Sequence, residues 1–325
     1  MTESSLIAEQ ALARVGTTLE ELHKHGGSLL TAGPAYLVGS LAQGFGNRGS
    51  DVDLHIFSPG VPGPAPPYLF FIGALTVDVE HFPLSYADDV LARLPEAGVV
   101  TKLGRMALDV PLGAGDTARL TRWCSAVPIA RDTPPIMDDE RRQTAMACLL
   151  RSAFTAVVSA WATAELVGRS RRDAGHLWRV CGRALLSLAG AAAGYPPIGR
   201  KWLPARVARA GIAEELVRSA MAMSGSADMA ALMAGLGFDA LDPTSLCRLE
   251  GGTGTADVRV GRERFHLTAL GTLEAGRRPE GGPCAEVLAR SGPDETARLL
   301  GDGLLRVVVD EGALSAALTS CEVGG

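Results

Sequence analysis

The sequence predicts an α+β protein that begins with a mixed sheet and its helices, continues as a bundle of helices, and ends in a small α/β extension. Three features predict this order. Short apolar runs that alternate with polar residues are frequent in residues 1–135, which is typical of half-buried strands. Longer segments with apolar residues at helical spacing fill residues 136–243, and short runs of both kinds return in residues 244–325. We therefore expect three domains with these boundaries.

Composition limits the classes of protein to which the chain can belong. With 325 residues, 47% of them apolar, it is long enough for two or three domains with buried cores. A formal net charge of −5 argues against broad electrostatic binding to nucleic acid. The six cysteines have no metal-type spacing, no secretory signal is visible, and no apolar run approaches the ~20 residues that span a bilayer. We expect a cytoplasmic protein without a membrane partner, as a monomer or an oligomer.

In the first domain, apolar residues at helical spacing predict one helix from Ser4 to about His25, which a Gly-Gly pair ends. Alternating apolar and polar residues then predict a succession of short extended segments. These are Ser28–Leu30, Tyr36–Gly39, Val52–Phe57, Tyr68–Ala74 and Leu75–Phe82, with a proline-rich loop over Pro59–Pro67 and further short segments at Ala107–Val110 and Val127–Arg131. A helix over Ala87–Leu94 is expected to cover the sheet.

The middle domain begins after Thr133-Pro134-Pro135, because proline lacks a backbone donor and restricts the residue before it. The expected helices are Asp138–Val167, Arg172–Gly194, Ala205–Ala220 and Ala227–Leu236, and the boundary to the last domain falls near Asp242-Pro243. In the last domain we expect a hairpin of Thr255–Val260 and Arg264–Leu270 that turns at Gly261, helices at Cys284–Arg290 and Asp294–Leu300, and a strand at Leu304–Val309. An accessory subdomain without DNA binding is expected, since no basic recognition helix is present.

The most informative stretch runs from Gly39 to Leu54 and reads GSLAQGFGNRGSDVDL. Asp51 and Asp53 stand one residue apart, so in an extended strand both carboxylates project from one face. Two neighbouring carboxylates repel each other unless a cation lies between them. Mg²⁺ that carries the phosphates of a nucleotide is the commonest such cation. The Gly-Ser pair at the start of the stretch lets backbone approach those phosphates and supplies amide and hydroxyl donors.

An apolar strand, Gly39-Ser40, a loop rich in glycine and asparagine, Ser50-Asp51-Val52-Asp53 and renewed apolar residues together resemble the signature of the polymerase-β-like nucleotidyltransferase superfamily. The resemblance is to its small-molecule branch, the kanamycin-type aminoglycoside nucleotidyltransferases. It covers the signature with its flanking strands closely and the first 200 residues more loosely. It implies nucleotide-binding roles for Gly39, Ser40 and Ser50. Arg48 in the loop is expected to reach the phosphates, or else to be a turn-forming polar residue like Asn47.

The resemblance also implies a third carboxylate from a neighbouring strand. In Leu75–Phe82, apolar residues alternate with Asp78 and Glu80, so both acids lie on one face. The family pattern places the third metal ligand at Asp78, together with Asp51 and Asp53. Glu80 lies roughly 6–7 Å further along the strand. It is a catalytic candidate that would activate the acceptor hydroxyl, or it is a solvated strand end.

A second segment, Tyr195 to Pro204, is similar to the Pro-x-x-Lys-Trp-Leu segment of small-molecule nucleotidyltransferases. There the lysine approaches the triphosphate, which carboxylates and metal ions cannot neutralise alone. We therefore expect Lys201 to bind the nucleotide, with Arg200 able to do the same bidentately. The alternative is a surface basic pair beside an anchoring Trp202.

Several further polar residues are weaker candidates. Glu165 is a possible position for a general base, if it reaches the acceptor hydroxyl. The cluster of Arg169, Arg171 and Arg172 is interpreted as a solvated helix end in preference to an acceptor site. His55 and His81 flank the acidic strands, where a single histidine is more often structural.

Together these residues predict an enzyme that transfers a nucleoside monophosphate, with AMP the expected group, from a nucleoside triphosphate to a small-molecule acceptor. ATP is the expected co-substrate, and two Mg²⁺ ions are expected on Asp51, Asp53 and Asp78. An antibiotic hydroxyl or a biosynthetic intermediate would fit as acceptor. The alternatives are nucleotidylation of a protein or tRNA, as in toxin-type members, and a non-catalytic relative that binds nucleotide. The intact set of three acids speaks against the last.

Overall fold

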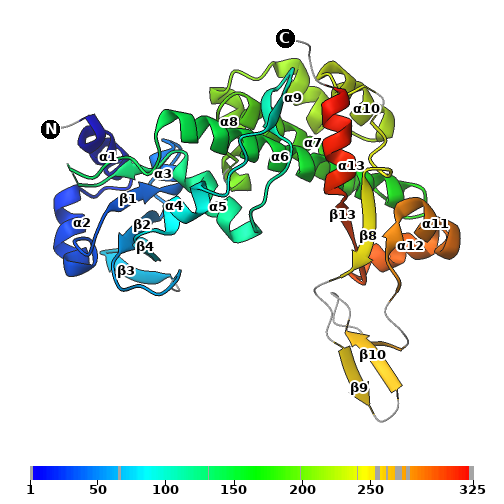
Figure 1. Ribbon diagram of the computed structural model, residues 1–325, viewed down its shortest axis with the longest axis horizontal. Helices are drawn as coiled ribbons and strands as arrows, with labels where there is room; N and C mark the ends of the chain where they lie inside the picture. The colour runs from blue at the N-terminus through cyan, green and yellow to red at the C-terminus, as the bar shows by residue number, and fades with distance from the viewer. Residues whose placement is uncertain are drawn as a thin grey trace. The chain divides into compact units, whose positions relative to one another are not determined.

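A computed structural model describes residues 3–64, 67–130, 132–197, 199–239, 241–252, 257–260, 263–267, 273–275 and 279–321 (Figure 1). It confirms a mixed α/β protein with a mixed sheet and a long helical region. Two compact units form, each from separate stretches of the chain. The first comprises Met1–Ala97, Val110–Leu149 and Ala193–Gly211, and the second comprises Gly98–Asp109, Leu150–Ala192 and Ile212–Gly325. The order of three domains stays a prediction.

A five-stranded mixed sheet is the centre of the first unit, with strand order β3-β4-β2-β1-β7 (Figure 1). Its strands are β1 (Ala35–Val38), β2 (Val52–Ser58), β3 (Tyr68–Ile72), β4 (Leu75–Pro83) and β7 (Val127–Pro128). Strands β2 and β4 are parallel, whereas β1–β2, β1–β7 and β3–β4 are antiparallel. The strands predicted around the acidic residues are thereby confirmed.

One face of this sheet is apolar and forms the main core of the first unit. Leu54 of β2 and Val79 of β4 are register partners and are buried there. Helices α1 (Glu3–Ala13) and α2 (Leu19–Gly26) contribute Leu12 and Leu22 to the same core. Burying a large aliphatic side chain stabilises a fold by about 1.5–3 kcal/mol. This packing leaves the alternate residues of β2 and β4 on the opposite face.

The single helix expected over Ser4–His25 is wrong, because α1 and α2 are separate. Between them Gly16 has a φ of +82°, a conformation that suits glycine. Thr18 then begins α2 by accepting a hydrogen bond from the Glu21 amide at 3.1 Å. Helical spacing therefore continues in the sequence across a break in the backbone. The extended segment expected just after α2 is instead a 3₁₀ turn, Gly27–Leu29.

Two further helices lie between strands β4 and β7 in the chain. Helix α4 (Tyr86–Leu91) confirms the helix expected after the acidic strands. Helix α5 (Ala114–Trp123) was not expected, and it carries residues of the candidate site. A second unexpected element is the hairpin of β5 (Gly98–Thr101) and β6 (Gly104–Ala107), which belongs to the second unit.

The long predicted helices are present as α6 (Asp139–Gly168), α7 (Gly175–Ala192) and α10 (Ser226–Gly235). The helix expected over Ala205–Ala220 is wrong. Its residues form α8 (Leu203–Arg209) in the first unit and α9 (Glu214–Met221) in the second. Gly211, with a φ of +63°, lies between them and interrupts the helical path.

Helix α6 corrects one expectation about apolar length. By length and composition alone this helix could cross a membrane, whereas no such segment is expected from the sequence. Of its most apolar 18-residue window, 67% is buried inside the protein. Such burial is typical of a core helix in a soluble protein, so this helix is weak support for a membrane span.

The C-terminal part of the second unit contains a three-stranded sheet with order β12-β8-β13. Its strands are β8 (Cys247–Gly251), β12 (Gly282–Pro283) and β13 (Leu305–Val309), and its helices are α11 (Cys284–Ser291), α12 (Pro293–Gly301) and α13 (Glu311–Ser320). The predicted helices and last strand are confirmed, whereas α13 was not expected. Strands β9 (Asp257–Val260), β10 (Glu263–Leu267) and β11 (Leu273–Ala275) form an antiparallel sheet. The turn expected at Gly261 lies outside the described residues.

Candidate functional site

The acidic residues come from the two parallel strands at the centre of the sheet in the first unit. Asp53 of β2 and Asp78 of β4 are register partners, and adjacent strands lie about 4.8 Å apart. Paired residues project from the same face, so these two carboxyl groups lie side by side. Asp51 precedes β2 and lines the same pocket as Asp53. The face that carries them is opposite to the apolar face that packs on α1 and α2.

The surroundings of these carboxyl groups disfavour their charged forms. Burial raises the pKa of Asp53 to about 6, and the charges of Asp78 and Asp51 contribute, against the lowering effect of Arg122. Burial also raises the pKa of Asp78, and the charge of Glu80 adds to this effect. A cation between such groups would offset both their mutual repulsion and their loss of solvent.

Gly39 brings backbone against this acidic pair. It begins the short helix α3 (Gly39–Ala42) directly after β1 and has a φ of +71°. A Cβ at this position would lie 2.3 Å from Asp53 Oδ2, which is far inside van der Waals contact. The conformation therefore favours glycine, and any side chain here would displace the Asp53 carboxylate. The Gly-Ser pair of the sequence motif thus ends β1 beside the carboxylate of the next strand.

The donor set suits a hard cation, but its arrangement is incomplete. Carboxylate oxygens are the ligands that Mg²⁺ prefers, and the buried Asp78 Oδ1 has no hydrogen-bond partner among the described residues. An unpartnered buried acceptor is costly unless a ligand satisfies it. Within the same described part of the chain, however, no group of three or more His, Cys, Asp or Glu side chains is positioned to hold a metal ion. The chemistry of Asp51, Asp53 and Asp78 fits Mg²⁺, but their side chains would have to rearrange for three of them to hold one ion.

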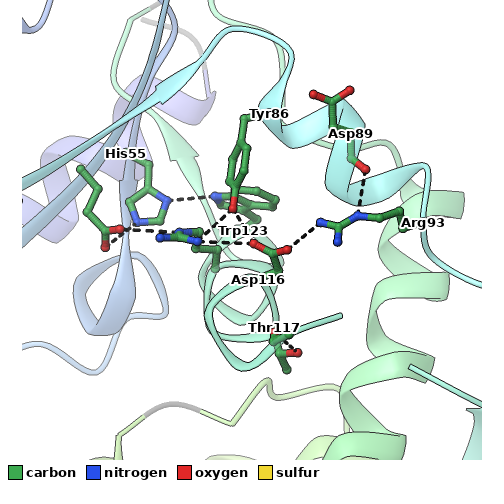
Figure 2. A network of polar contacts seen from close by, with 10 residues as sticks. His55, Tyr86, Asp89, Arg93, Asp116, Thr117 and Trp123 are labelled. Atoms are coloured by element: carbon green, nitrogen blue, oxygen red, sulfur yellow. Dashed lines mark hydrogen bonds and ion pairs between the residues drawn. The ribbon is translucent and has the colours of Figure 1, made fainter. Parts of the chain in front are cut away.

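Glu80 lies two residues beyond Asp78 on the same face and is held by His55 and by two arginines of α5. Figure 2 shows the surrounding polar network, with His55, Tyr86, Asp116 and Trp123 labelled. Arg122 Nη1 of α5 lies 2.6 Å from Glu80 Oε1, and Arg119 Nε lies 3.7 Å from Glu80 Oε2. His55 Nε2 lies 3.5 Å from Glu80 Oε1. The hydrogen bond from His55 and the positive charges of both arginines lower the pKa of Glu80 to about 2. Such a carboxylate is a poor proton acceptor at neutral pH, so this geometry favours a positioning role over the expected activation of the acceptor.

The protonation of His55 follows from its other neighbour. Trp123 Nε1 donates a hydrogen bond to His55 Nδ1 at 2.9 Å, as Figure 2 shows. An indole nitrogen can only donate, so Nδ1 carries no proton and the ring hydrogen of neutral His55 lies on Nε2, toward Glu80. Burial lowers the pKa of His55, which agrees with a neutral ring. His55 is therefore a structural link between the aromatic core and Glu80, the role expected for a single strand histidine.

A second branch of the network fixes Arg119. Its Nη1 donates to the Tyr86 hydroxyl at 2.9 Å, and Tyr86 donates in turn to Asp116. Arg93 also pairs with Asp116, at 2.6 Å. The guanidinium of Arg119 lies over the rings of Phe82 and Tyr86, 5.2 and 5.6 Å from their centroids. These contacts tie α5 to α4 and to the polar face of the sheet.

Asp53 and Asp51 line a cavity of about 350 Å³, whereas Asp78 is not among its lining residues. One wall contains Gly39, Ser40, Asp51 and Asp53, and the others contain Thr121 and Arg122 of α5 together with Pro197, Gly199, Lys201 and Trp202. All these residues belong to the first unit. The structure thus brings the Lys-Trp segment together with the Gly-Ser and Asp-Val-Asp segments. Thr121 and Arg122 were missed from the sequence, because α5 has no local pattern that marks a site.

Aromatic and cationic side chains hold the Lys-Trp segment against the loop that follows Ser40. Lys201 Nζ lies 5.5 Å from the Trp202 ring centroid, and Trp202 stacks on Phe45 with centroids 6.3 Å apart. The Arg209 guanidinium lies 4.0 Å from the centroid of Phe45. It also donates to the carbonyl oxygens of Gln43 at 2.6 Å and Gly44 at 3.0 Å. These contacts fix the position of Lys201 in the cavity wall.

A larger cavity of about 580 Å³ shares Asp51 with the first. It contains Arg48 and Ser50, which the structure does not place in the smaller cavity, and Glu21 and His25 of α2. The Ser50 hydroxyl accepts a hydrogen bond from the Asn47 amide at 3.1 Å, and the Asn47 side chain accepts one from the Gly49 amide at 3.0 Å. Asn47 and Ser50 therefore shape the loop that carries Asp51.

Other candidates are not among the residues that line these cavities. Arg200 is exposed and does not line either cavity. Glu165 belongs to the second unit, where its carboxylate lies 3.5 Å from Arg169. The Arg171 amide donates to Asp294 at 2.9 Å. His81 projects from β4 on the face opposite to Glu80, since the two are consecutive in a strand.

The smaller cavity contains Gly39, Ser40, Asp51 and Asp53 of the sequence signature and Lys201 of the second segment. Ser50, Arg48 and Asp78 do not line it. Neither a comparison with protein-family models nor a comparison with curated proteins gives a match to this chain.

Proposed function

We propose that the protein is a Mg²⁺-dependent nucleotidyltransferase that moves a nucleoside monophosphate, with AMP the expected group, from a nucleoside triphosphate to a small-molecule hydroxyl. One observation carries this proposal: Lys201 and Ser40 line the same cavity as Asp51 and Asp53. A triphosphate needs backbone donors, a point charge and carboxylate-bound cations together. The cavity combines all three kinds of group.

Within this proposal the polar groups in and beside the cavity have separate roles. Asp51, Asp53 and Asp78 would hold two Mg²⁺ ions, which supply charge neutralisation at the phosphates when bound. Gly39 and Ser40 provide close backbone and a hydroxyl, and Lys201 binds the triphosphate. An acceptor oxygen forms a bond to the α-phosphorus, and the bond from that phosphorus to pyrophosphate breaks. The acceptor proton is released to solvent or a base, and positioning supplies most of the rate enhancement.

We assign the acceptor to the larger neighbouring cavity. It shares only Asp51 with the smaller cavity, which we call the phosphate cavity because the triphosphate is proposed to bind there. A ligand in the larger cavity would therefore approach the reacting centre from another side. Its volume of about 580 Å³ suits a small molecule. Thr17 fixes Glu21 in its wall through a hydrogen bond of 3.0 Å, which provides an oriented carboxylate for a polar acceptor. A cytoplasmic location, where nucleoside triphosphates and Mg²⁺ are abundant, belongs to the same proposal.

The test is transfer of label from each α-³²P nucleoside triphosphate in the presence of Mg²⁺ and a panel of hydroxylated small molecules. We expect a labelled small molecule and release of pyrophosphate, both of which Asp53→Asn abolishes. Label on protein or tRNA would instead support the toxin-like alternative. Tight nucleotide binding without turnover would support a non-catalytic relative. Absence of both binding and transfer would overturn the proposal.

A further inference from the structure

We infer that Arg122 is a phosphate-binding residue of the smaller cavity, and that Glu80 holds it in position for this task. The inference rests on the proposed function and extends it to a residue outside the sequence signature. It assigns a second cationic side chain to the triphosphate, from a different segment of the chain than Lys201. It also gives Glu80 a positioning role in place of a catalytic one.

The position of Arg122 supports phosphate binding. It lies in the last turn of α5, its side chain is 35% exposed, and it lines the cavity together with Ser40, Asp53 and Lys201. A guanidinium carries five N–H donors in one plane. Glu80 engages Nη1 at 2.6 Å, and among the described residues no other carboxylate forms an ion pair with Arg122. Donors therefore remain for the two-point contact that phosphate oxygens favour.

A chain of buried contacts fixes this guanidinium before any ligand binds. The Trp123 indole orients His55, and the Nε2–H of His55 faces the same Glu80 oxygen that Arg122 contacts. His55 is 0% and Trp123 1% exposed, so this support lies inside the core. An arginine that is already ordered loses less conformational entropy on binding than a free surface side chain. The arrangement thus provides a second ordered positive charge in the cavity that Lys201 also lines.

The charge balance of the cavity requires such a residue. Asp51 and Asp53 place negative charge in the cavity wall. The positive charge of Arg122 lowers the pKa of both Asp53 and Asp78, against the larger effect of burial. A triphosphate adds further negative charge at the same place. Cations on the protein must offset this repulsion in addition to any bound metal.

Arg119 is a control that distinguishes phosphate binding by Arg122 from a purely structural role. It contacts the same Glu80, through Nε at 3.7 Å, and belongs to the same helix. However, it is directed to Tyr86 and Asp116 and does not line the cavity. If the arginines act only by stabilising Glu80, removing either should have the same effect. If Arg122 binds phosphate, only its removal should weaken binding.

The experiment measures affinities for tripolyphosphate and for ATP with Mg²⁺ by isothermal titration calorimetry, using the full chain. Arg122→Met should weaken both by about 10–100-fold, the loss expected for a charged hydrogen bond. Arg122→Lys, which keeps the charge but not the fork, should lie between, and Arg119→Met should stay within about threefold of the unchanged protein. Thermal unfolding of each variant shows whether it is folded, and Arg122→Lys carries the test if the methionine variant is not.

The outcomes are distinguishable. Equal affinities of the unchanged protein and the Arg122 variants would overturn this inference alone. Equal losses in the Arg119 and Arg122 variants would overturn it in favour of a role through Glu80. If the unchanged protein binds neither tripolyphosphate nor ATP, the proposed function fails and this inference fails with it.

Discussion

Gly39 and Asp53 approach each other so closely that the glycine cannot carry a side chain without displacing the carboxylate. This contact places the end of β1 against Asp53 of β2. A Cβ added to Gly39 would lie 2.3 Å from Asp53 Oδ2. We therefore expect Gly39→Ala to lower stability by about 1–3 kcal/mol through backbone strain and to reduce nucleotidyl transfer strongly. Thermal unfolding and the transfer assay measure the two effects.

Gly60 is the matched control for this substitution. Its φ of +79° is similar, but nothing lies within 4 Å of an added Cβ. Gly60→Ala should lower stability for the same conformational reason and leave transfer unchanged. Equal losses of activity in the two variants would show that the contact with Asp53 has no functional role.

The pKa of Asp53 predicts a stability change that depends on pH. Its value of about 6 in the folded protein lies above the ordinary 3.8, so folding favours the protonated form. The stability that this group contributes is complete below pH 3.8 and is lost as the pH rises through 6. Asp53→Asn keeps the site neutral, so without metal it should exceed the unchanged protein in stability by up to about 3 kcal/mol at pH 8 and match it near pH 4.

Urea unfolding in the presence of a chelator, at several pH values, measures this difference. Asp51→Asn is the comparison variant, because Asp51 is exposed. Both variants should lose transfer activity by about 1,000-fold, but Asp53→Asn should gain clearly more stability at high pH, because burial of Asp53 is the largest cause of its raised pKa. A destabilised Asp53→Asn at pH 8 would contradict the burial argument.

Glu80 predicts the opposite dependence on pH. Its pKa of about 2 in the folded protein lies below the ordinary 4.5, because His55 donates a hydrogen bond and Arg122 and Arg119 are close. The resulting stability is present above pH 4.5 and is lost as the pH falls through 2. Glu80→Gln should therefore be less stable than the unchanged protein at pH 7, and the difference should shrink toward pH 2. Chemical unfolding between pH 2.5 and 7 tests this, and a difference that grows on acidification would refute the ion pair.

Lys201 and Arg200 make a direct comparison between two neighbouring basic residues. Lys201 lines the cavity and lies over Trp202, whereas Arg200 does not line it. Lys201→Ala should raise the KM for the nucleoside triphosphate by about 10–100-fold with a smaller effect on kcat, because the lost contact binds the ground state as well. Arg200→Ala should have a smaller effect on KM. Steady-state kinetics at saturating acceptor distinguish the two, and a larger effect of Arg200→Ala would reverse the assignment.

The acidic strands could be predicted from the sequence because the relevant pattern is local. Alternation of apolar and polar residues fixes which side chains share a face, so Asp78 and Glu80 were expected together on one face of β4. Their different surroundings could not be predicted, since these depend on arginines from α5 that lie about 40 residues further along the chain. Local spacing carries no information about such tertiary contacts.

Helix boundaries show a second limit of local patterns. The break at Gly16 and the break at Gly211 both lie within apolar spacing that continues as if one helix were present. Positive φ angles at single glycines change the chain direction without disturbing the sequence period. Lys201 was expected in the cavity only because its segment resembles that of a known family, since no spacing rule links it to residues 150 positions earlier.

The assembly of the first unit from three separated stretches has a consequence for synthesis of the protein. Residues of the phosphate cavity come from positions 39–53, 118–122 and 197–202, so the ribosome must translate past Gly211 before this unit has all its parts. Until then the nascent chain carries Asp51, Asp53 and Arg122 of this cavity without Lys201. Contacts between such distant segments slow folding. A fragment that ends near residue 135 would lack Lys201 and the rest of its segment, so it would not form the complete cavity.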